Sequence, residues 1–432
     1  MNDLLDRYFL LSASGTNVRR ELMAGLTTFM AMAYITVVNP AILSSAGMDF
    51  GAVFVATCLA AAAGTLVMGL YANYPVALAP GMGQNAFFTY GIVLGMGHAW
   101  QTALGAVFIS GVAFIILSLL PVREWLINAI PRALKLGISA GIGLFLGIIA
   151  LSGSGVIVTN PATMVSLGDL TATPALLMLS GFVLIAALAA RKFTGAVVTG
   201  IMAVTIAGWL TGTAEFHGLV SAPPAMTTLL ELDIAGAFEL SMVTVILTLL
   251  LVDVFDTAGT LVGVANRTGM LDENGKLPRL RKALLADSGA TAVGALMGTS
   301  STTSYIESAA GAEVGGRTGL TAVATASLFL LCLFIAPLAQ SIPSFATGAA
   351  LLFVACIMAR ALEELPWGDI TEATPAIITA LAMPLSYSIA DGIGLGFISY
   401  AAIKVLSGRH RECPIAVYLV AVIFILKFGF LG

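Results

Sequence analysis

The chain has 432 residues, of which 59% are hydrophobic and only 10% are charged, and its formal net charge is −4. Its mean hydropathy of +1.00 excludes an ordinary soluble domain. Apolar runs of about 20 residues recur, and each is long enough to cross the hydrocarbon core of a bilayer. The four cysteines lack metal-ligand spacing and the three histidines fall in or near predicted loops, so we expect neither a metal ion nor a cofactor.

Residues 1–21 are polar to amphipathic and lack the pattern of a cleavable signal peptide, so we expect the chain to enter the membrane through its own first helix. The distribution of basic residues, described below, predicts that residues 1–21 are cytoplasmic. Fourteen apolar segments follow and predict an all-α polytopic membrane protein with fourteen spans. They lie at 22–42, 51–72, 76–96, 101–120, 134–152, 173–190, 194–212, 238–262, 283–298, 302–317, 319–341, 345–359, 371–388 and 391–407. A further apolar run, 414–431, is either an interfacial helix or a fifteenth span.

The basic residues test this map independently. With the N-terminus inside, every loop that contains Lys or Arg is expected in the cytoplasm, whereas the loops named below as outside contain none. The inside residues are Arg19, Arg20, Arg123, Arg132, Lys135, Arg191, Lys192, Arg267, Lys276, Arg279, Arg281, Lys282, Arg317, Arg360, Arg409 and Arg411. The outside loops are 43–50, 97–100, 153–172, 213–237, 342–344 and 389–390. This partition follows the positive-inside rule and supports the number of spans and their orientation.

Fourteen spans divide into two halves of seven. Because seven is odd, the second half must lie inverted relative to the first. Inverted repeats are common among secondary transporters, which place the substrate near the bilayer midplane where broken helices from both halves meet. The map therefore predicts a 7+7 inverted repeat.

The third and tenth spans are poor continuous helices. In the third, Pro80 removes a hydrogen-bond donor and the glycines beside it loosen the backbone, so the helix is expected to begin near Gln84. In the tenth, the hydroxyl-rich run 299–304 favours an extended strand before Glu307, although ordinary helix packing through hydroxyls is the alternative. Irregular backbone at membrane depth must be buried in protein or line a cavity. We therefore expect two half-helices, each after a short strand, facing a common pocket.

Four carboxylates lie within or beside apolar segments: Asp253, Asp256, Asp287 and Glu307. An ionised side chain near the bilayer centre costs about 2.5–3.5 kcal/mol on insertion scales, so such residues are retained for a partner or a task. Asp253 and Asp256 are three residues apart and share one helix face. The cluster predicts a polar site inside the membrane.

The residue types around this site favour a flat, polar heterocycle over a sugar or an inorganic ion. Asn85 and Glu307 stand at the beginnings of the two proposed half-helices. Carboxylates accept hydrogen bonds from N–H donors, and an amide both donates and accepts. Tyr305, Phe87 and Phe88 could present ring faces to a planar ligand.

Structural alternatives stay open for several of these residues. Asp253 could form only an inter-helix hydrogen bond, and Asp287 could pair with Arg281 or Lys282. Glu313 and Arg317 are four residues apart and could form a pair on one helix face. An anion exchanger or channel of the same fold would need a cationic site, and a membrane-embedded enzyme would need a nucleophile or metal constellation that the sequence lacks.

Long stretches of the chain resemble purine nucleobase permeases of the AzgA-like branch of the nucleobase:cation symporters, in the nucleobase–ascorbate transporter superfamily. The uracil and xanthine permeases are more distant. The resemblance rests on GTNVRRELMAGLTTFMAMAYITVVNPAIL (15–43), ALAPGMGQNAFFTYGIVLGMG (77–97), VDVFDTAGTLVGVA (252–265) and ADSGATAVGALMGTSSTTSYIESAAGAEVGGRTGLTA (286–322). Gln84 departs from the family, which often has an apolar residue there.

The resemblance implies a core domain (22–120 and 213–341), a gate domain (121–212 and 342–407) and a C-terminal apolar segment (408–432). It implies no enzymatic activity, but import of a purine base together with a proton across the cell membrane. The expected partners are this base, the proton and the lipid bilayer, with no nucleic acid, and a homodimer is one assembly open to the chain. Guanine and hypoxanthine are the favoured substrates, with an adenine-selective permease as the alternative.

The resemblance also assigns roles to residues. Glu307 and Asp256 match substrate-binding acids, Asn85 matches a residue that shapes the purine site, and Asp287 matches an acid associated with transport. The expected substrate-binding residues are Asn85, Phe87, Asp256, Tyr305 and Glu307. Proton coupling is expected at Asp253, Asp256, Asp287 and Glu307, because these acids are titratable and partly desolvated.

Overall fold

A computed structural model describes residues 2–120, 130–270 and 277–430. Arg123 and Lys276, two of the predicted cytoplasmic cations, lie outside these ranges. The described residues form a mostly helical fold of membrane type, in which nine helical stretches are long and apolar enough to cross a bilayer. Shorter apolar helices occupy other predicted spans, for example Ala196–Leu210 and Ile370–Ser386.

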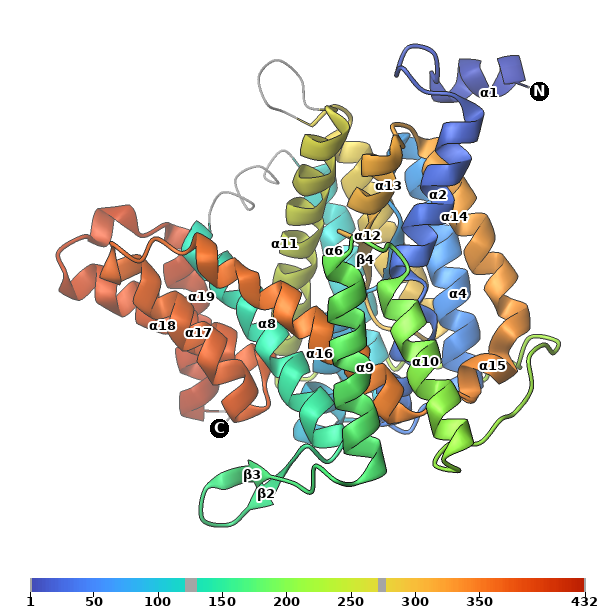
Figure 1. The fold of residues 1–432 in the computed structure, drawn as a ribbon. Helices are drawn as coiled ribbons and strands as arrows, with labels where there is room; N and C mark the ends of the chain where they lie inside the picture. The colour runs from blue at the N-terminus through green and yellow to red at the C-terminus, as the bar shows by residue number, and fades with distance from the viewer. Residues whose placement is uncertain (1, 121–129, 271–276, 431–432) are drawn as a thin grey trace.

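Helices cover the predicted apolar segments in chain order (Figure 1). The first part of the chain contains α1 (Asn2–Phe9), α2 (Val18–Met32), α3 (Ile35–Ser44), α4 (Phe50–Val67), β1 (Leu78–Pro80), α5 (Met82–Ala86), α6 (Trp100–Leu119), α8 (Arg132–Gly153), β2 (Ile157–Asn160), β3 (Met164–Leu167), α9 (Thr173–Ala190) and α10 (Ala196–Leu210). Two π-helical stretches, Met68–Ala72 and Phe87–Gly95, continue α4 and α5.

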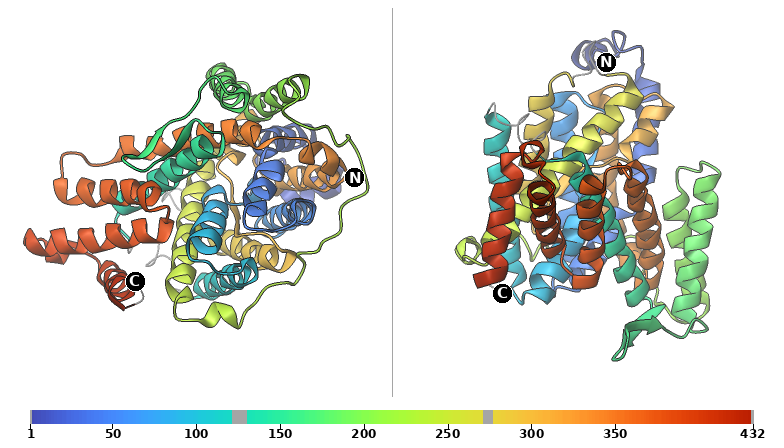
Figure 2. Two further views of the ribbon diagram at one scale, coloured as in Figure 1. Left: turned by 90° about the horizontal axis from the view of Figure 1, so that it is seen from below. Right: turned by 90° about the vertical axis from the view of Figure 1, so that its left-hand side faces the viewer.

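The second part contains α11 (Met242–Thr268), α12 (Leu280–Met297), β4 (Thr302–Ser304), α13 (Ser308–Val314), α14 (Gly319–Cys332), α15 (Ala336–Gln340), α16 (Ser344–Ala359), α17 (Ile370–Ser386), α18 (Ile389–Leu406) and α19 (Ile415–Phe430). The hairpin of β2 and β3 lies at the opposite end of the molecule from α1 (Figures 1 and 2).

The helices pack in two groups. In one group, α2 contacts α13 and α14, α4 contacts α3 and α14, and α12 contacts α4 and α6. In the other, α8 contacts α16 and α17, α16 contacts α9 and α10, and α17, α18 and α19 follow one another outward. Figure 1 shows α17–α19 on the side away from α1, and the second view in Figure 2 shows them in front of the rest.

The two predicted helix breaks meet as a pair of short strands. β1 runs antiparallel to β4, with Leu78 opposite Ser304 and Pro80 opposite Thr302. The Gly81 N–H donates to the Ser301 carbonyl (2.9 Å), and the Tyr305 N–H donates to the Ala77 carbonyl (2.9 Å). The extended form expected for both breaks is confirmed, and α5 and α13 begin within two residues of Gln84 and Glu307.

A buried glutamate joins α2 to α14. The Glu21 carboxylate is fully buried and accepts hydrogen bonds from the backbone N–H groups of Arg317 (2.9 Å), Thr318 (3.3 Å) and Thr321 (3.2 Å). A carboxylate at a helix N-terminus satisfies free N–H groups and interacts favourably with the helix dipole. The pair considered between Glu313 and Arg317 is not present: Glu313 pairs with Arg267, and the Arg317 guanidinium donates to the backbone carbonyls of Ala312 and Gly316.

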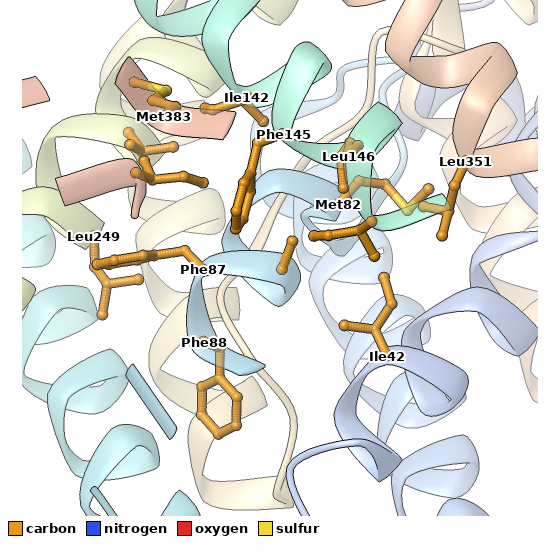
Figure 3. Packing of buried hydrophobic residues seen from close by; sticks show 14 of the residues in the cluster. Ile42, Met82, Phe87, Phe88, Ile142, Phe145, Leu146, Leu249, Leu351 and Met383 are labelled. Atoms are coloured by element: carbon orange, nitrogen blue, oxygen red, sulfur yellow. The ribbon is translucent and has the colours of Figure 1, made fainter. Parts of the chain in front are cut away.

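The interior between the two groups of helices is apolar. Figure 3 shows Phe87, which follows α5, in one cluster with Leu249 of α11 and Phe145 of α8. Phe88 belongs to the same cluster, and its ring points to a different side from that of Phe87. Both phenylalanines are almost completely buried, so Phe87 contributes a ring at the boundary between the two helix groups.

Candidate functional site

The four intramembrane acids lie around the β1–β4 pair. Asp253 and Asp256 are on α11, Asp287 is on α12, and Glu307 directly precedes α13. Both α11 and α12 pack against β4. The acids nevertheless divide into two kinds when their hydrogen-bond partners are compared.

Asp253 and Asp287 are fully buried and well supplied with donors. The Gln84 amide donates to one oxygen of Asp253 (3.1 Å), and the Thr291 hydroxyl donates to the other (2.8 Å). Asp287 accepts from the Ser304 N–H (2.8 Å) and hydroxyl (2.6 Å) and from the Thr257 hydroxyl (2.5 Å). These two carboxylates therefore tie α11 and α12 to the strands.

The ion pair considered for Asp287 is not present among the described residues. Lys282 instead lies over the ring of Tyr71, with its nitrogen 5.1 Å from the ring centroid. The inter-helix hydrogen bond considered for Asp253 is present, through Thr291 of α12.

Asp256 and Glu307 have free acceptor capacity. Both side chains are only partly buried. No hydrogen bond to the Asp256 carboxylate occurs within residues 2–120, 130–270 and 277–430, and its principal charged neighbour is Asp253. Glu307 receives one side-chain hydrogen bond, from the Tyr34 hydroxyl (2.7 Å). A carboxylate offers about four acceptor positions, so both groups can accept further N–H donors.

Tyr305 connects the strands to these two acids. Its hydroxyl donates to the Pro80 carbonyl (2.5 Å), and its side chain lies within electrostatic reach of Asp256 and Glu307. Tyr305 is thus held rigidly by β1 and lies beside both acids. The structure therefore places the predicted substrate-binding residues Asp256, Tyr305 and Glu307 close together.

Asn85 lies on the first turn of α5 and contacts the residues that precede β4. Its side-chain oxygen accepts a hydrogen bond from the Ser300 hydroxyl, whereas its amide nitrogen is buried without a partner. The side-chain oxygens of Gln84, Ser301 and Thr302 are also buried and unpartnered. Buried polar atoms are normally paired with protein, water or ligand. This region therefore has unused donors and acceptors for a polar ligand or ordered water.

Tyr34 is a site residue that the sequence analysis missed. It lies between α2 and α3 and is almost fully buried, and its partner Glu307 is 273 residues away in the chain. The available signal was a phenol in an apolar span, where a buried hydroxyl requires an acceptor. Among the described residues no group of three or more metal-ligating side chains is present.

Comparison with known proteins finds a family that matches most of the chain. Residues 19–395 match the model of a permease family. An adenine permease of Escherichia coli, AdeP, is 49% identical over 99% of this chain and 96% of its own length. A guanine/hypoxanthine permease of Bacillus subtilis, PbuG, is 44% identical over 98% of this chain and 99% of its own length. A putative permease of Methanocaldococcus jannaschii is 52% identical over 99% of both chains.

Solved structures show the same fold. The transmembrane domain of a cyanobacterial bicarbonate transporter, BicA, has a TM-score of 0.66 at 16% identity and covers 87% of this chain and 96% of its own. SLC26A9 has a TM-score of 0.68 at 9% identity, over 94% of this chain and 69% of its own. At such low identity the likeness concerns the fold alone.

Proposed function

The chain belongs to the permease family, and we propose that it is a secondary active transporter that imports purine nucleobases by proton symport. The observation that carries the proposal is the pair of partly buried acids with free acceptor positions, Asp256 and Glu307, both within electrostatic reach of Tyr305. The named relatives support it, since they are permeases for adenine and for guanine and hypoxanthine.

Guanine and hypoxanthine suit this arrangement. In their keto forms both bases present an N1–H donor, and guanine adds an exocyclic amine, so Asp256 and Glu307 can accept from neighbouring N–H groups. Hydrogen bonds to a charged group contribute about 1.5–3 kcal/mol each. The ring of Tyr305 and the amide of Asn85 complete the proposed contacts, with Phe87 as part of the apolar boundary.

An adenine-selective permease is the second candidate. Two adenine permeases of Escherichia coli are 49% and 46% identical to this chain, somewhat more than the guanine/hypoxanthine permeases of Bacillus subtilis at 44% and 43%. Gln84 also places an amide beside Asn85, and amides can pair with adenine through both its N6 donor and a ring acceptor.

Proton coupling would use the same acids. A neutral base is accumulated only if the gradient of another solute drives its transport. Protonation neutralises a partly desolvated carboxylate, and this lowers the free-energy cost of enclosing the binding site between the core and gate segments. Asp256 and Glu307 are the foremost candidates because their oxygens are not saturated by protein donors. Asp253 and Asp287, which were included in the sequence-based proposal, are proposed to act mainly by holding the strands.

The proposed transport cycle moves the core segments, 22–120 and 213–341, relative to the gate segments, 121–212 and 342–407. The β1–β4 pair, α5 and α13 would carry the base with the core. An anion exchanger of the same fold is disfavoured, because the groups surrounding Tyr305 are acidic and would repel an anion.

Counterflow in proteoliposomes tests this proposal directly. Vesicles loaded with unlabelled purine should take up labelled guanine, hypoxanthine or adenine, whereas uracil should compete poorly. An imposed acidic exterior should drive accumulation, and a protonophore should abolish it. Uptake of bicarbonate or chloride without purine counterflow would reject the purine function in favour of an anion transporter.

A further inference from the structure

An apolar cavity of about 200 Å³ lies between α10 and the helices α2, α3, α14 and α15. Tyr34, whose hydroxyl donates to Glu307, is on its wall, so the cavity borders the acidic site. One wall comes from α10, which packs with α9 and α16, and the opposite wall comes from helices of the other group. Met30 of α2 and Met202 of α10 are among its lining residues. The cavity therefore lies in the seam between the two helix groups.

The lining offers nothing to a polar ligand. No charged side chain is among the described lining residues. The two hydroxyls of the wall are already engaged, because Tyr34 donates to Glu307 (2.7 Å) and Thr36 donates to the Ala33 carbonyl (2.8 Å). Apolar cavities of roughly 150 Å³ stay dry and take up apolar molecules such as benzene. Water and a purine are therefore poor occupants, since their polar groups would be buried without partners.

The cavity is lined by residues of apolar helical stretches, and part of its lining is exposed. Val18–Ser44 and Gly319–Gln340 are among the helical stretches apolar enough to cross a bilayer. Met30, Met202, Ile335 and Leu338 are partly exposed, so part of the lining is accessible from outside. The same helices expose large apolar side chains, including Ile206 (46%) and Leu331 (62%), as expected of a surface in contact with lipid.

We propose that the acyl chain of a membrane phospholipid enters this cavity from the side and fills the seam between α10 and the α2–α3 and α14–α15 segments. The chain comes from the hydrocarbon of the bilayer, so the gain arises from van der Waals contacts with walls that otherwise face an empty space, and the flexible methionines on both walls can adapt to the chain. An acyl chain forms no directional bonds, so it could stay in place while the walls shift. This last consequence rests on the proposed transport cycle, whereas the binding itself does not.

Photo-crosslinking in vesicles tests the binding. The full-length protein is reconstituted in phosphatidylcholine and phosphatidylglycerol with a small fraction of phosphatidylcholine that carries a diazirine on one acyl chain. Irradiation should attach lipid to Cys332 or Met202 in the cavity, as well as to Val422 and Leu426 on the exposed face of α19. Cys332 is only 7% exposed, so a lipid on the outer surface alone does not reach it readily.

Two variants fill the cavity from opposite walls: Ala33→Phe and Val198→Phe. Each should lower crosslinking at the cavity residues at least fivefold while leaving the α19 signal unchanged. A labelled α19 surface with no label in the cavity of the wild-type protein would overturn the proposal, as would undiminished cavity labelling in the filled variants. Native mass spectrometry of the wild-type protein provides a check without substitutions, and is expected to show one retained phospholipid.

Purine counterflow measured on the same vesicles separates the two proposals. Cavity labelling without any purine transport would support the lipid site and count against the proposed function. Purine transport by a wild-type protein whose cavity is unlabelled would support the proposed function and reject the lipid site.

Discussion

Replacing Asp287 should damage the fold, whereas replacing Asp256 should damage only binding. In Asp287→Ala the Ser304 N–H and hydroxyl both lose their acceptor inside the protein. The Thr257 hydroxyl can turn to Thr303, whose oxygen is 3.0 Å away. Leaving a buried polar group without a hydrogen-bond partner costs about 1–3 kcal/mol. The two groups of Ser304 therefore predict a loss of about 2–6 kcal/mol in the free energy of unfolding.

Asp256→Ala is the matched control, because it removes the same carboxylate from the neighbouring helix without breaking a hydrogen bond among the described residues. Its free energy of unfolding should change by less than about 1 kcal/mol. Unfolding in mixed micelles, titrated with a denaturing detergent and followed by tryptophan fluorescence, measures both variants with and without purine. We expect the Asp256 variant to lose the stabilisation by purine. Normal stability of Asp287→Ala, or equal destabilisation by both substitutions, would refute this division of roles.

Four further outcomes are expected. Glu307→Gln should weaken purine binding tenfold or more in calorimetry. Tyr34→Phe should weaken binding less, since it removes only one donor to Glu307. Unchanged purine affinity of Glu307→Gln would reject a contact between Glu307 and the base. A single cysteine at Thr163, in the predicted outside loop 153–172, should react with an impermeant maleimide from outside the cell; labelling only after permeabilisation would reverse the topology. Purine uptake should collapse with a protonophore and be indifferent to sodium, and sodium-driven uptake without a proton gradient would exclude proton symport. Glu21→Ala should lower the unfolding temperature without altering purine affinity in the remaining folded protein, because it removes the acceptor of N–H groups at the start of α14 and, among the described residues, no contact to the four acids. A selective loss of affinity would contradict this structural role.

The sequence also allowed the unusual third and tenth spans to be located. Pro80 and the glycines beside it disfavour a continuous helix, and the run 299–304 is rich in β-branched and hydroxyl residues. These are local properties of the chain, which explains why the beginnings of α5 and α13 were predictable to within two residues. The sequence could not show that the two breaks pair as adjacent antiparallel strands, since Pro80 and Thr302 are far apart in the chain.

Hydropathy and charge by themselves determined the membrane class, the apolar segments and the four acids within or beside them, because the cost of placing a group in lipid depends mainly on its own chemistry. They did not single out Glu21, whose burial depends on α14. Only the tertiary structure decided how these acids differ. Asp253 and Asp287 are saturated by donors from other elements, whereas Asp256 and Glu307 keep free oxygens. A hydrogen bond depends on distance and direction between groups brought together by folding, so partners such as Tyr34 and Glu307 cannot be identified from local sequence alone.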